Sequence, residues 1–393
     1  MKKRIFRYLT HIFGTVLTLG ILGAAFIISM NGTFDTSTNK LGMSLENEGP
    51  YVFYESDSTY SVNYIGGNRH EGFHVNTQLH QFNEEVHIDC YFPLDQTKFD
   101  VHLNQDFKSP KSYYNDGEQV LAISDIESGY KTFRNYLINN SVINQDLNWT
   151  FGKGHLVLVG DFMDRGMSTT QVLWFIYKLE QEAKEKGGHV HFIIGNHELY
   201  NMQGKFKSAS PKYYGVASIL GKQQHHLYDD NSYIGKWMAS KNTIEMINGN
   251  LFTHGGIHPD IVKYEVSLED INRISRESYR KPFFPKPGKT AEQLLRSTTK
   301  GLSWYRGYFE GKLTQDEIEA TLHKFKAKAI IVGHTPQWTV KSLYENKVFA
   351  IDVKHPKDYK DEWPKKRSEG LLIKDQKYIR LLDNQKTFEL KKK

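Results

Sequence analysis

The chain has 393 residues, of which 39% are hydrophobic and 24% are charged, and this composition is typical of a globular protein with one large domain and an appendage. Residues 2–7 and 391–393 supply seven basic side chains, so the formal net charge of +6 leaves the body between them with a charge of −1. This distribution argues against nucleic acid as a partner, and the single cysteine, Cys90, excludes an intramolecular disulfide or a thiolate metal cage.

An uncharged and mostly apolar run extends from Ile12 to Met30, directly after the basic residues 2–7. Crossing a bilayer takes about 17–25 apolar residues and a signal-peptide core about 7–15, so residues 1–30 are predicted to be an uncleaved single-pass membrane anchor. The small residues Gly23-Ala24-Ala25 leave a cleaved signal and a secreted protein as the alternative. Positive charge before the run predicts that the rest of the chain lies outside the cytoplasm, on the periplasmic side of the cell envelope.

Residues 31–50 are polar and rich in Gly, Asn and Ser, which predicts a juxtamembrane linker. Residues 51–114 predict a small β-rich unit, because short runs of Val, Tyr and Phe are separated by Gly, Asn and Asp. Its expected strands are 51–54, 60–65, 72–80 and 85–92. The aromatic residues alternate at strand period, so we expect them to pack in a core rather than to bind a ligand.

From residue 115 to residue 385, β-branched runs alternate with amphipathic helices, which indicates an α/β domain followed by a basic tail at 386–393. The expected buried strands are 120–124, 155–159, 190–194, 251–253, 329–332 and 348–351. The clearest helix spans Thr169 to Lys186, with Ser168 placed to cap its start and Gly187-Gly188 to end it.

Polar clusters follow five of these strands. The clusters are 124–127 (SDIE), 160–166 (GDFMDRG), 195–198 (GNHE), 253–256 (THGG) and 333–336 (GHTP). Any one of them alone is more often a turn or a helix cap than a ligand site. Because the carboxyl ends of strands in an α/β sheet are where sites assemble, five such clusters in this order indicate a metal centre built from Asp, Glu, Asn and His.

The order of the five clusters resembles the calcineurin-like metallophosphoesterase superfamily, and GDFMDRG followed by GNHE resembles its phosphoprotein-phosphatase branch. The segments GPYVFY, WFIYKLEQEAKEKGGHVHFIIGNHE, SWYRGYF and IVGHTP are similar to the Shewanella-like bacterial phosphatases. The similarity runs from about Gly49 to Asp352. It implies a sandwich of two mixed β-sheets flanked by helices, here preceded by the small β-rich unit and the N-terminal membrane helix.

The resemblance also implies two divalent metal ions and their ligands. Asp125 would bind the first ion, and Asp161 would bridge both, as a carboxylate with two oxygens can. The second ion would take Asn196, His254 and His334.

The resemblance also implies which residues would act on the substrate. His197 would be the general acid, oriented by Asp164, while a hydroxide that bridges the two ions attacks phosphorus. Arg165 would hold phosphate oxygens, and Arg306, on a weaker local match, would be a second phosphate clamp.

The first motif departs from the superfamily pattern, because Asp125-Ile126-Glu127 stands where Asp-x-His is expected. Glu127 is long enough to bind a metal ion and would raise the number of carboxylates at the cluster from two to three. Such a cluster favours manganese, iron or magnesium over zinc, with manganese preferred. We favour ligation over a weak or absent first metal, because a buried carboxylate without a partner is costly.

The implied activity is hydrolysis of phosphate monoesters, with phosphoproteins phosphorylated on Ser/Thr or Tyr as the favoured substrates. One alternative is the hydrolysis of nucleotides or dinucleoside polyphosphates on the same metal core. Another is a catalytically impaired binding module of the envelope, in which Glu127 has disabled the first metal.

Overall fold

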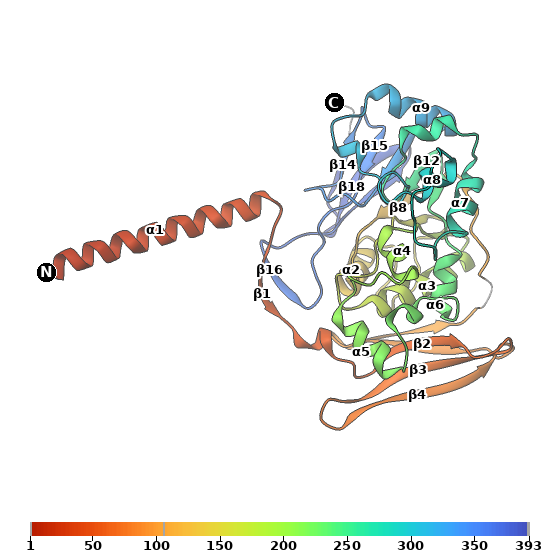
Figure 1. Ribbon diagram of the computed structural model, residues 1–393, viewed down its shortest axis with the longest axis horizontal. Coiled ribbons are helices and arrows are strands. Elements are labelled where there is room, and N and C mark those ends of the chain that lie inside the picture. Colours follow the sequence, from red (N-terminus) through yellow and green to blue (C-terminus); the bar gives the residue numbers. More distant parts are fainter. Residues whose placement is uncertain (1, 105–106, 391–393) are drawn as a thin grey trace.

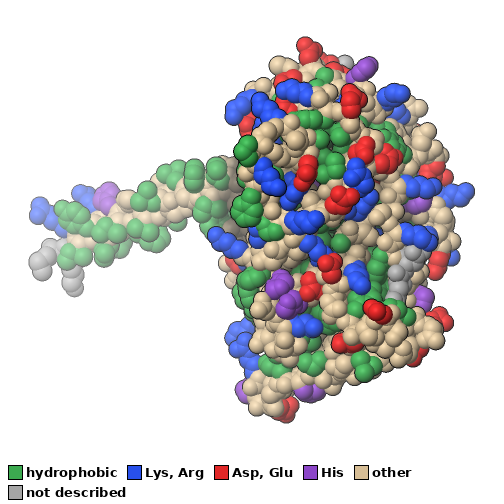
Figure 2. All heavy atoms as spheres, turned by 45° about the vertical axis from the view of Figure 1, so that its right-hand side comes forward, with side chains coloured by type: hydrophobic (Ala, Val, Ile, Leu, Met, Phe, Trp, Pro, Cys, Tyr) green, Lys and Arg blue, Asp and Glu red, His purple; other side chains and the backbone are tan. Residues whose placement is uncertain are grey.

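The computed structural model describes residues 2–104 and 107–390, so Met1 of the predicted anchor and the lysines at 391–393 of the predicted basic tail lie outside the described residues. Helix α1 (Lys2–Ser29) stands away from a compact body (Figure 1). Basic side chains gather at its free end (Figure 2). Its segment Lys3–Ser29 contains an 18-residue window with a mean hydropathy of 2.2 and has the length to cross a membrane, which agrees with the predicted apolar helix.

Two mixed β-sheets form the centre of the body (Figure 1). The first consists, in spatial order, of β10 (His189–Phe192), β9 (His155–Leu158), β8 (Val120–Ile123), β17 (Glu369–Lys374), β18 (Lys377–Leu382) and β19 (Thr387–Glu389). The second consists of β14 (Lys341–Leu343), β15 (Val348–Ala350), β13 (Ala329–Val332), β12 (Asn250–Thr253), β11 (Ile244–Ile247) and β7 (Tyr113–Tyr114). In the first sheet the parallel strands β10, β9 and β8 are joined on one side to antiparallel strands, and in the second sheet the parallel strands β15, β13 and β12 have an antiparallel strand on each side. This confirms the predicted sandwich of two mixed sheets.

Hydrophobic residues fill the space between the two sheets and the space outside each of them. Strand β8 is buried on both faces. Val120 and Ala122 belong to the core between the sheets, whereas Leu121 and Ile123 belong to the core under the helices. A strand that is buried on both faces needs an apolar residue at every position. All six strands expected between residues 120 and 351 are present, with ends that differ by at most two residues.

Helices cover the outer face of each sheet. Those that share the core of the first sheet are α2 (Tyr130–Asn139), α3 (Thr169–Glu185), α4 (Asn196–Met202), α5 (Pro211–Ile219) and α6 (Tyr233–Ala239). Those that share the core of the second sheet are α7 (Leu268–Arg276), α8 (Ala291–Arg296) and α9 (Gln315–Phe325). Short 3₁₀ helices span Lys40–Met43, Gln224–Leu227, Pro259–Lys263 and Gly307–Phe309. Ser168 precedes α3 as expected, but its side chain makes no capping hydrogen bond, so that detail of the prediction is wrong.

The predicted β-rich unit consists of a three-stranded sheet and a hairpin. The sheet is formed by β2 (Glu48–Tyr54), β3 (Thr59–Asn68) and β4 (Gly72–Gln81), and the hairpin by β5 (His87–Phe92) and β6 (Thr97–His102). Its aromatic residues pack as expected: the ring of Phe99 lies 5.4 Å from that of Phe175 on α3, and Trp174 donates to the carbonyl of Pro50 at 2.9 Å. The unit therefore shares one hydrophobic core with the helices of the first sheet. Strand β7 at its predicted end belongs instead to the second large sheet.

The predicted linker contains secondary structure. Strand β1 (Phe34–Thr38) pairs with the antiparallel β16 (Lys360–Trp363), which comes from the far end of the chain. Composition alone did not predict this strand, because its partner is distant in sequence and its own residues are mostly polar. The pairing ties the segment that follows α1 to the body.

A buried ion pair joins β2 to helix α5. The Nζ atom of Lys212 lies 2.8 Å from one carboxylate oxygen of Glu48, and the hydroxyls of Tyr51 and Thr170 donate to the other oxygen at 3.0 and 2.7 Å. Both charged side chains are at most 2% exposed. Removal of one member of such a pair leaves an uncompensated buried charge.

We expect Lys212→Met to lower the free energy of unfolding by about 3–5 kcal/mol, because Glu48 would stay buried without its cation. Chemical denaturation in detergent, followed by tryptophan fluorescence, measures the change. The matched control is Lys312→Met, which removes an exposed ion pair with Glu310 and should change stability by less than about 1 kcal/mol. Equal effects of the two substitutions would contradict the expectation.

Candidate active site and metal centre

The five strand-end clusters meet where the two sheets lie side by side. Asp125 follows β8, Asp161 follows β9, and Asn196 begins α4 after β10, all from the first sheet. His254 follows β12 and His334 follows β13, both from the second sheet. All five residues are at most 8% exposed. The predicted meeting of these side chains at one rim is present in the structure.

Distances show how closely these side chains meet. The Nε2 atom of His254 lies 3.2 Å from Oδ2 of Asp161 and 3.1 Å from Oδ1 of Asn196. The backbone N–H of His334 donates to Oδ2 of Asp125 at 3.1 Å, and the rings of the two histidines are 4.9 Å apart. The structure thus brings all five predicted ligands of the resemblance into contact with one another.

Glycine is required beside the ligands because the chain comes so close to them. A Cβ at Gly160 would lie 2.5 Å from Nδ1 of His254, and a Cβ at Gly195 would lie 2.4 Å from Oδ1 of Asp161. Neither separation is possible for real atoms, so both positions need glycine. The glycines of the GD and GNHE motifs therefore make room for the buried side chains.

Several residues at the site have a left-handed backbone that is unusual outside glycine. Their φ angles are 55° at Asp125, 58° at Asp161, 67° at Asp164 and 65° at His334. Such conformations are unfavourable for ordinary residues and persist where the surrounding structure enforces them, most often at functional sites. Here they turn each side chain from the end of its strand into the rim.

The donor atoms fit a divalent cation. Ligand atoms of Asp161, His254 and His334 all lie within 4.8 Å of one another. Nδ1 of His254 lies 2.7 Å from the carbonyl oxygen of Val159, which can only accept, so this nitrogen carries a proton and Nε2 is the atom that would bind a cation. Carboxylate oxygens beside neutral imidazoles are ligands that manganese, iron and zinc accept.

Negative charge dominates the electrostatics of the cluster. Burial lowers the pKa of His254, but the carboxylates of Asp161 and Asp125 outweigh it and raise that pKa to about 10. Burial, together with the nearby carboxylate of Asp161, raises the pKa of Asp125 to about 7. A divalent cation would satisfy these carboxylates, and it would displace the proton of His254 because a ligating imidazole is neutral.

His197 lies beside the cluster, and Asp164 fixes the orientation of its ring. Its Nδ1 donates to Oδ2 of Asp164 at 2.8 Å, and Asn201 donates to the other oxygen of Asp164 at 2.9 Å. Its Nε2 is buried, has no hydrogen-bond partner and lies 3.8 Å from Oδ2 of Asp161. Burial lowers the pKa of His197, but Asp161 and Asp164 outweigh it and raise the pKa above its ordinary value. A protonated Nε2 that faces the cluster is what a general acid requires.

Glu127 has charged partners in the structure. Its carboxylate forms an ion pair with Arg165, and Nζ of Lys357 lies 3.7 Å from its second oxygen. The expectation that Glu127 would have no charged partner unless it bound a metal ion is therefore wrong, because Arg165, from the loop after β9, forms an ion pair with it. Ligation of a metal ion by Glu127 remains a proposal, and holding Arg165 is the role that its contacts support directly.

Metal analysis tests the proposal for Glu127. We expect Glu127→Ala to lower the manganese content per chain and Glu127→His to keep it, because an imidazole at this position would also bind a metal ion. Lys357→Ala, which removes the neighbouring cation alone, is the control and should leave the metal content unchanged. If Glu127→Ala kept its full metal content, Glu127 would not be a metal ligand, and its ion pair with Arg165 would be its only supported role.

Arg306 lies on the opposite side of the cluster. One of its nitrogens donates to the carbonyl oxygen of His334 at 2.5 Å and to the hydroxyl of Thr335 at 3.0 Å. These contacts place the guanidinium of this exposed residue beside a predicted ligand, as expected of a residue that would contact phosphate oxygens.

Two carboxylates at the site had no role in the sequence-based prediction. Glu198 accepts hydrogen bonds from the backbone N–H groups of Asp161, Phe162 and Gly195 at 2.9–3.0 Å, so it shapes the loop that carries Asp161. Asp352 is 4% exposed, and burial beside Asp125 and Glu127 raises its pKa well above the ordinary value. Asp352 lies just after strand β15, so the search for polar residues at the carboxyl ends of strands would have found it if it had included that strand.

A pocket of about 280 Å³ opens beside the cluster. Its lining includes Asp125, Glu127, Arg165 and Asp352. It also includes Thr33, which lies just after the N-terminal helix. The pocket therefore connects the metal-ligand cluster with the segment that follows α1.

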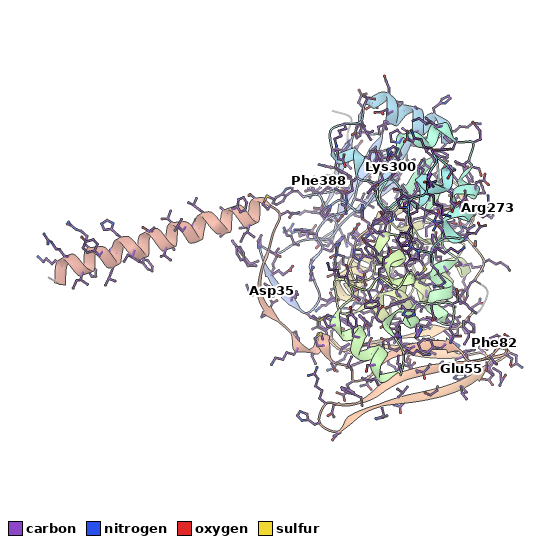
Figure 3. The ribbon with its side chains drawn as sticks, viewed as in Figure 1. Asp35, Glu55, Phe82, Arg273, Lys300 and Phe388 are labelled. Carbon is purple, nitrogen blue, oxygen red and sulfur yellow. The ribbon has the colours of Figure 1, made fainter. Side chains whose placement is uncertain are left out.

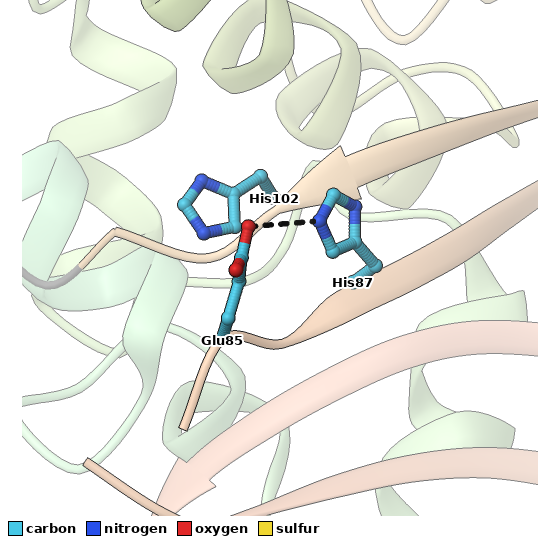
Figure 4. Close-up of side chains that lie close together, drawn as sticks. All are labelled: Glu85, His87 and His102. Atoms are coloured by element: carbon cyan, nitrogen blue, oxygen red, sulfur yellow. Dashed lines mark ion pairs between the residues drawn. The ribbon is translucent and has the colours of Figure 1, made fainter. Parts of the chain in front are cut away.

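Two other groups of histidine and acidic side chains lie elsewhere in the described part of the chain. Glu85, His87 and His102 are exposed on the β5–β6 hairpin (Figure 4), where His87 lies 3.7 Å from Glu85 and its other ring nitrogen 2.8 Å from Asp100. Asp116, His155 and His189 meet at the amino ends of β9 and β10, opposite the strand ends that carry the site. Neither group belongs to the candidate active site.

Comparison with known proteins agrees with this geometry. A family model described as calcineurin-like phosphoesterase matches residues 119–338. Shewanella-like protein phosphatase 1 of Plasmodium berghei is 30% identical over 267 residues, which cover 63% of this chain and 71% of that protein. Shewanella-like protein phosphatase 2 of Arabidopsis thaliana is 23% identical over 334 residues, or 72% of this chain and 82% of that protein.

A solved structure is similar over nearly its whole length. The crystal structure of a cold-active protein-tyrosine phosphatase of a psychrophilic Shewanella species superposes with a TM-score of 0.76 at 29% identity, and the match covers 88% of this chain and 99% of that one. The resemblance stated from the sequence motifs is confirmed by these matches. The chain belongs to the calcineurin-like phosphoesterase family.

Proposed function

We propose that this protein is a metal-dependent phosphomonoesterase that acts on phosphoproteins, phosphorylated on Ser/Thr or Tyr. The observation that carries the proposal is the buried His197, whose Nδ1 is held by Asp164 and whose Nε2 faces Asp161 without a hydrogen-bond partner. A buried polar atom without a hydrogen-bond partner costs free energy, so its presence calls for an explanation such as a catalytic role. A module that only binds phosphate has no need of this proton donor.

Members of this family typically bind two metal ions, and the site offers ligands for two. Asp125, Asp161, Asn196, His254 and His334 would hold them, and Glu127 would join the ligands of the first ion. We favour manganese, because oxygen donors outnumber the two imidazoles. When bound, two such ions lower the pKa of a bound water and neutralise charge on the phosphoryl oxygens.

The protein side chains would supply the remaining steps. His197 would transfer its Nε2 proton to the oxygen that leaves phosphorus, since an alkoxide or phenoxide is a poor leaving group without protonation. Asp164 fixes the ring orientation through Nδ1. Arg165 and Arg306 would bind the phosphoryl oxygens, for which the planar guanidinium has the right geometry.

The preference for phosphoproteins is supported by the relatives, two of which are named protein phosphatases and one a protein-tyrosine phosphatase. A substrate panel tests it: the purified full chain with manganese would be assayed on phosphotyrosine and phosphoserine peptides, on a dinucleoside tetraphosphate and on p-nitrophenyl phosphate. We expect the highest kcat/KM with a phosphopeptide. A higher value with the dinucleotide would favour the alternative nucleotide hydrolase, and no turnover of any substrate would favour the impaired binding module.

We also propose that α1 is an uncleaved anchor with the body on the periplasmic side of the cell envelope. The length and hydropathy of α1 and the basic residues at its start support this arrangement. Resistance of the protein to extraction from membranes by alkaline carbonate is the expected result. Release into the soluble fraction would instead support a cleaved signal.

A further inference from the structure

The chain that leaves α1 is held by the body through Asn31. The backbone oxygen of Asn31 accepts from Nζ of Lys354 at 2.6 Å, and its side-chain oxygen accepts from Nζ of Lys366 at 2.5 Å. Its amide nitrogen donates to the carbonyl of Gln337 at 3.4 Å. These contacts hold one side of the body at the point where the predicted membrane segment ends.

The next residues extend this attachment. Strand β1 pairs with β16, and the carboxylate of Asp35 on β1 lies 2.7 Å from Nζ of Lys360 on β16. Figure 3 labels Asp35 on the side of the body from which α1 emerges. The segment 353–367, which contains β16, therefore lies close to the end of α1.

This segment carries an excess of positive charge. Residues 353–367 contain six basic and three acidic side chains, and the acidic Asp358 is turned inward, where it accepts from the backbone N–H groups of Lys131 and Thr132. Lys354 and Lys366 form no ion pair with a carboxylate of the described residues. Burial and the nearby ammonium of Lys354 lower the pKa of Lys366, and the carboxylate of Glu362 opposes this shift without reversing it.

Exposed tryptophans lie beside these lysines. Trp338 is 58% exposed and Trp363 is 56% exposed, although Trp is usually largely buried in folded proteins. Nζ of Lys366 lies 5.5 Å from the ring centre of Trp338, and the ring of Phe34 lies 6.3 Å from that of Trp363. Tryptophan beside lysine, next to the end of an apolar helix, is the pattern found where proteins contact the headgroup layer of a membrane.

We propose that a docking face, formed by Trp338, Lys354, Trp363, Lys365 and Lys366, rests on the anionic headgroups of the bilayer that α1 crosses. The inference rests on the proposed anchor, because α1 brings the face to the membrane. The lysines supply attraction to anionic lipids, and the tryptophans enter the interface with their apolar rings. An anionic lipid surface is the partner that matches both the charge and the aromatic content of the face.

The position of the face bears on access to the active site. The pocket that contains Asp125 and Arg165 is also lined by Thr33, Lys354 and Lys366. The pocket therefore adjoins the docking face. With the face on the bilayer, the site would open next to the membrane surface, where it meets substrates that are themselves bound to the membrane.

A fluorescent label tests the docking face in the full chain. Cys90 is fully buried, so a new cysteine on the surface can be labelled selectively. An environment-sensitive dye would be attached through Lys365→Cys and, as a control, through Arg273→Cys, which Figure 3 labels on the side opposite α1. Both proteins would be reconstituted in nanodiscs of phosphatidylcholine with or without phosphatidylglycerol.

We expect a blue shift of the dye at position 365 in discs with phosphatidylglycerol, a smaller shift in their absence, and none at position 273. High salt should reduce the shift, because it screens attraction between exposed charges. Lys354→Gln with Lys366→Gln in the labelled protein should remove it, whereas Lys281→Gln with Lys286→Gln, which removes two exposed lysines elsewhere, should not.

Several results would overturn the proposal. A shift at 365 that ignores both lipid charge and salt would exclude an anionic surface as the partner. So would a shift of equal size at 273, or one that survives removal of Lys354 and Lys366. Alkaline extraction of the same samples separates these results from a failure of the anchor, because a released protein shows that α1 does not hold the chain in the bilayer. Turnover of p-nitrophenyl phosphate in detergent reports on the catalytic proposal independently.

Discussion

Asp161→Asn is expected to abolish turnover while it leaves the fold intact. The carboxylate of Asp161 uses both oxygens: Oδ1 accepts from the backbone N–H of His197 at 3.0 Å, and Oδ2 lies 3.2 Å from Nε2 of His254. An asparagine keeps the size of the side chain but loses the negative charge and one acceptor oxygen. If Asp161 bridges two metal ions, kcat/KM should fall by about 10³-fold or more, which corresponds to about 4 kcal/mol in the barrier.

The measurement pairs steady-state rates with metal content and circular dichroism of the same preparation. Asp260→Asn is the matched control, since it makes the same chemical change at a partly exposed carboxylate that forms an ion pair with Lys263. The control should keep full activity. Substantial turnover by Asp161→Asn at full metal content would refute the bridging role.

His197→Ala is expected to lower turnover by about 10²–10⁴-fold, the range that a general acid contributes. The loss should depend on the leaving group. It should be largest for phosphoserine, whose alkoxide must be protonated, and smaller for p-nitrophenyl phosphate, whose phenoxide leaves more readily. Metal content should stay unchanged, because the ring of His197 is held by Asp164 rather than placed among the ligand atoms.

The dependence on leaving group separates proton donation from a structural effect. A variant that merely disturbs the loop would lose the same factor on both substrates. His323→Ala, at an exposed histidine of α9, is the control and should behave as the wild type. Equal losses on phosphoserine and p-nitrophenyl phosphate would argue that His197 acts by position alone.

The centre of the fold could be predicted because its signals are local. Strands β8, β9 and β13 are short, mostly apolar runs that are soon followed by Gly or Ser, and α3 carries apolar residues at helical spacing, Val172, Ile176, Leu179 and Ala183. Strands β16 to β19 were not predicted. They pair antiparallel, and β16 and β17 take the distant strands β1 and β8 as partners, so part of their stability comes from contacts with segments far away in the sequence.

The candidate ligands could be predicted for the same reason. Asp125, Asp161 and Asn196 each lie within four residues of a strand end, and strand ends of one sheet meet at one rim. The partners of the site residues could not be predicted from the sequence. Glu127 forms an ion pair with Arg165 only because two loops fold against each other, and this pair compensates the charge of Glu127 without a metal ion.

The sequence by itself determined that the chain has an apolar N-terminal segment, an α/β body and a set of Asp, Asn and His residues at strand ends, because each of these is written in neighbouring residues. Only the tertiary structure decided which charges are paired, that Glu198 shapes the loop that carries Asp161, and that β16 lies beside the end of α1. Those features depend on contacts between segments far apart in the chain, where burial and charge are set by the partner and not by the local sequence.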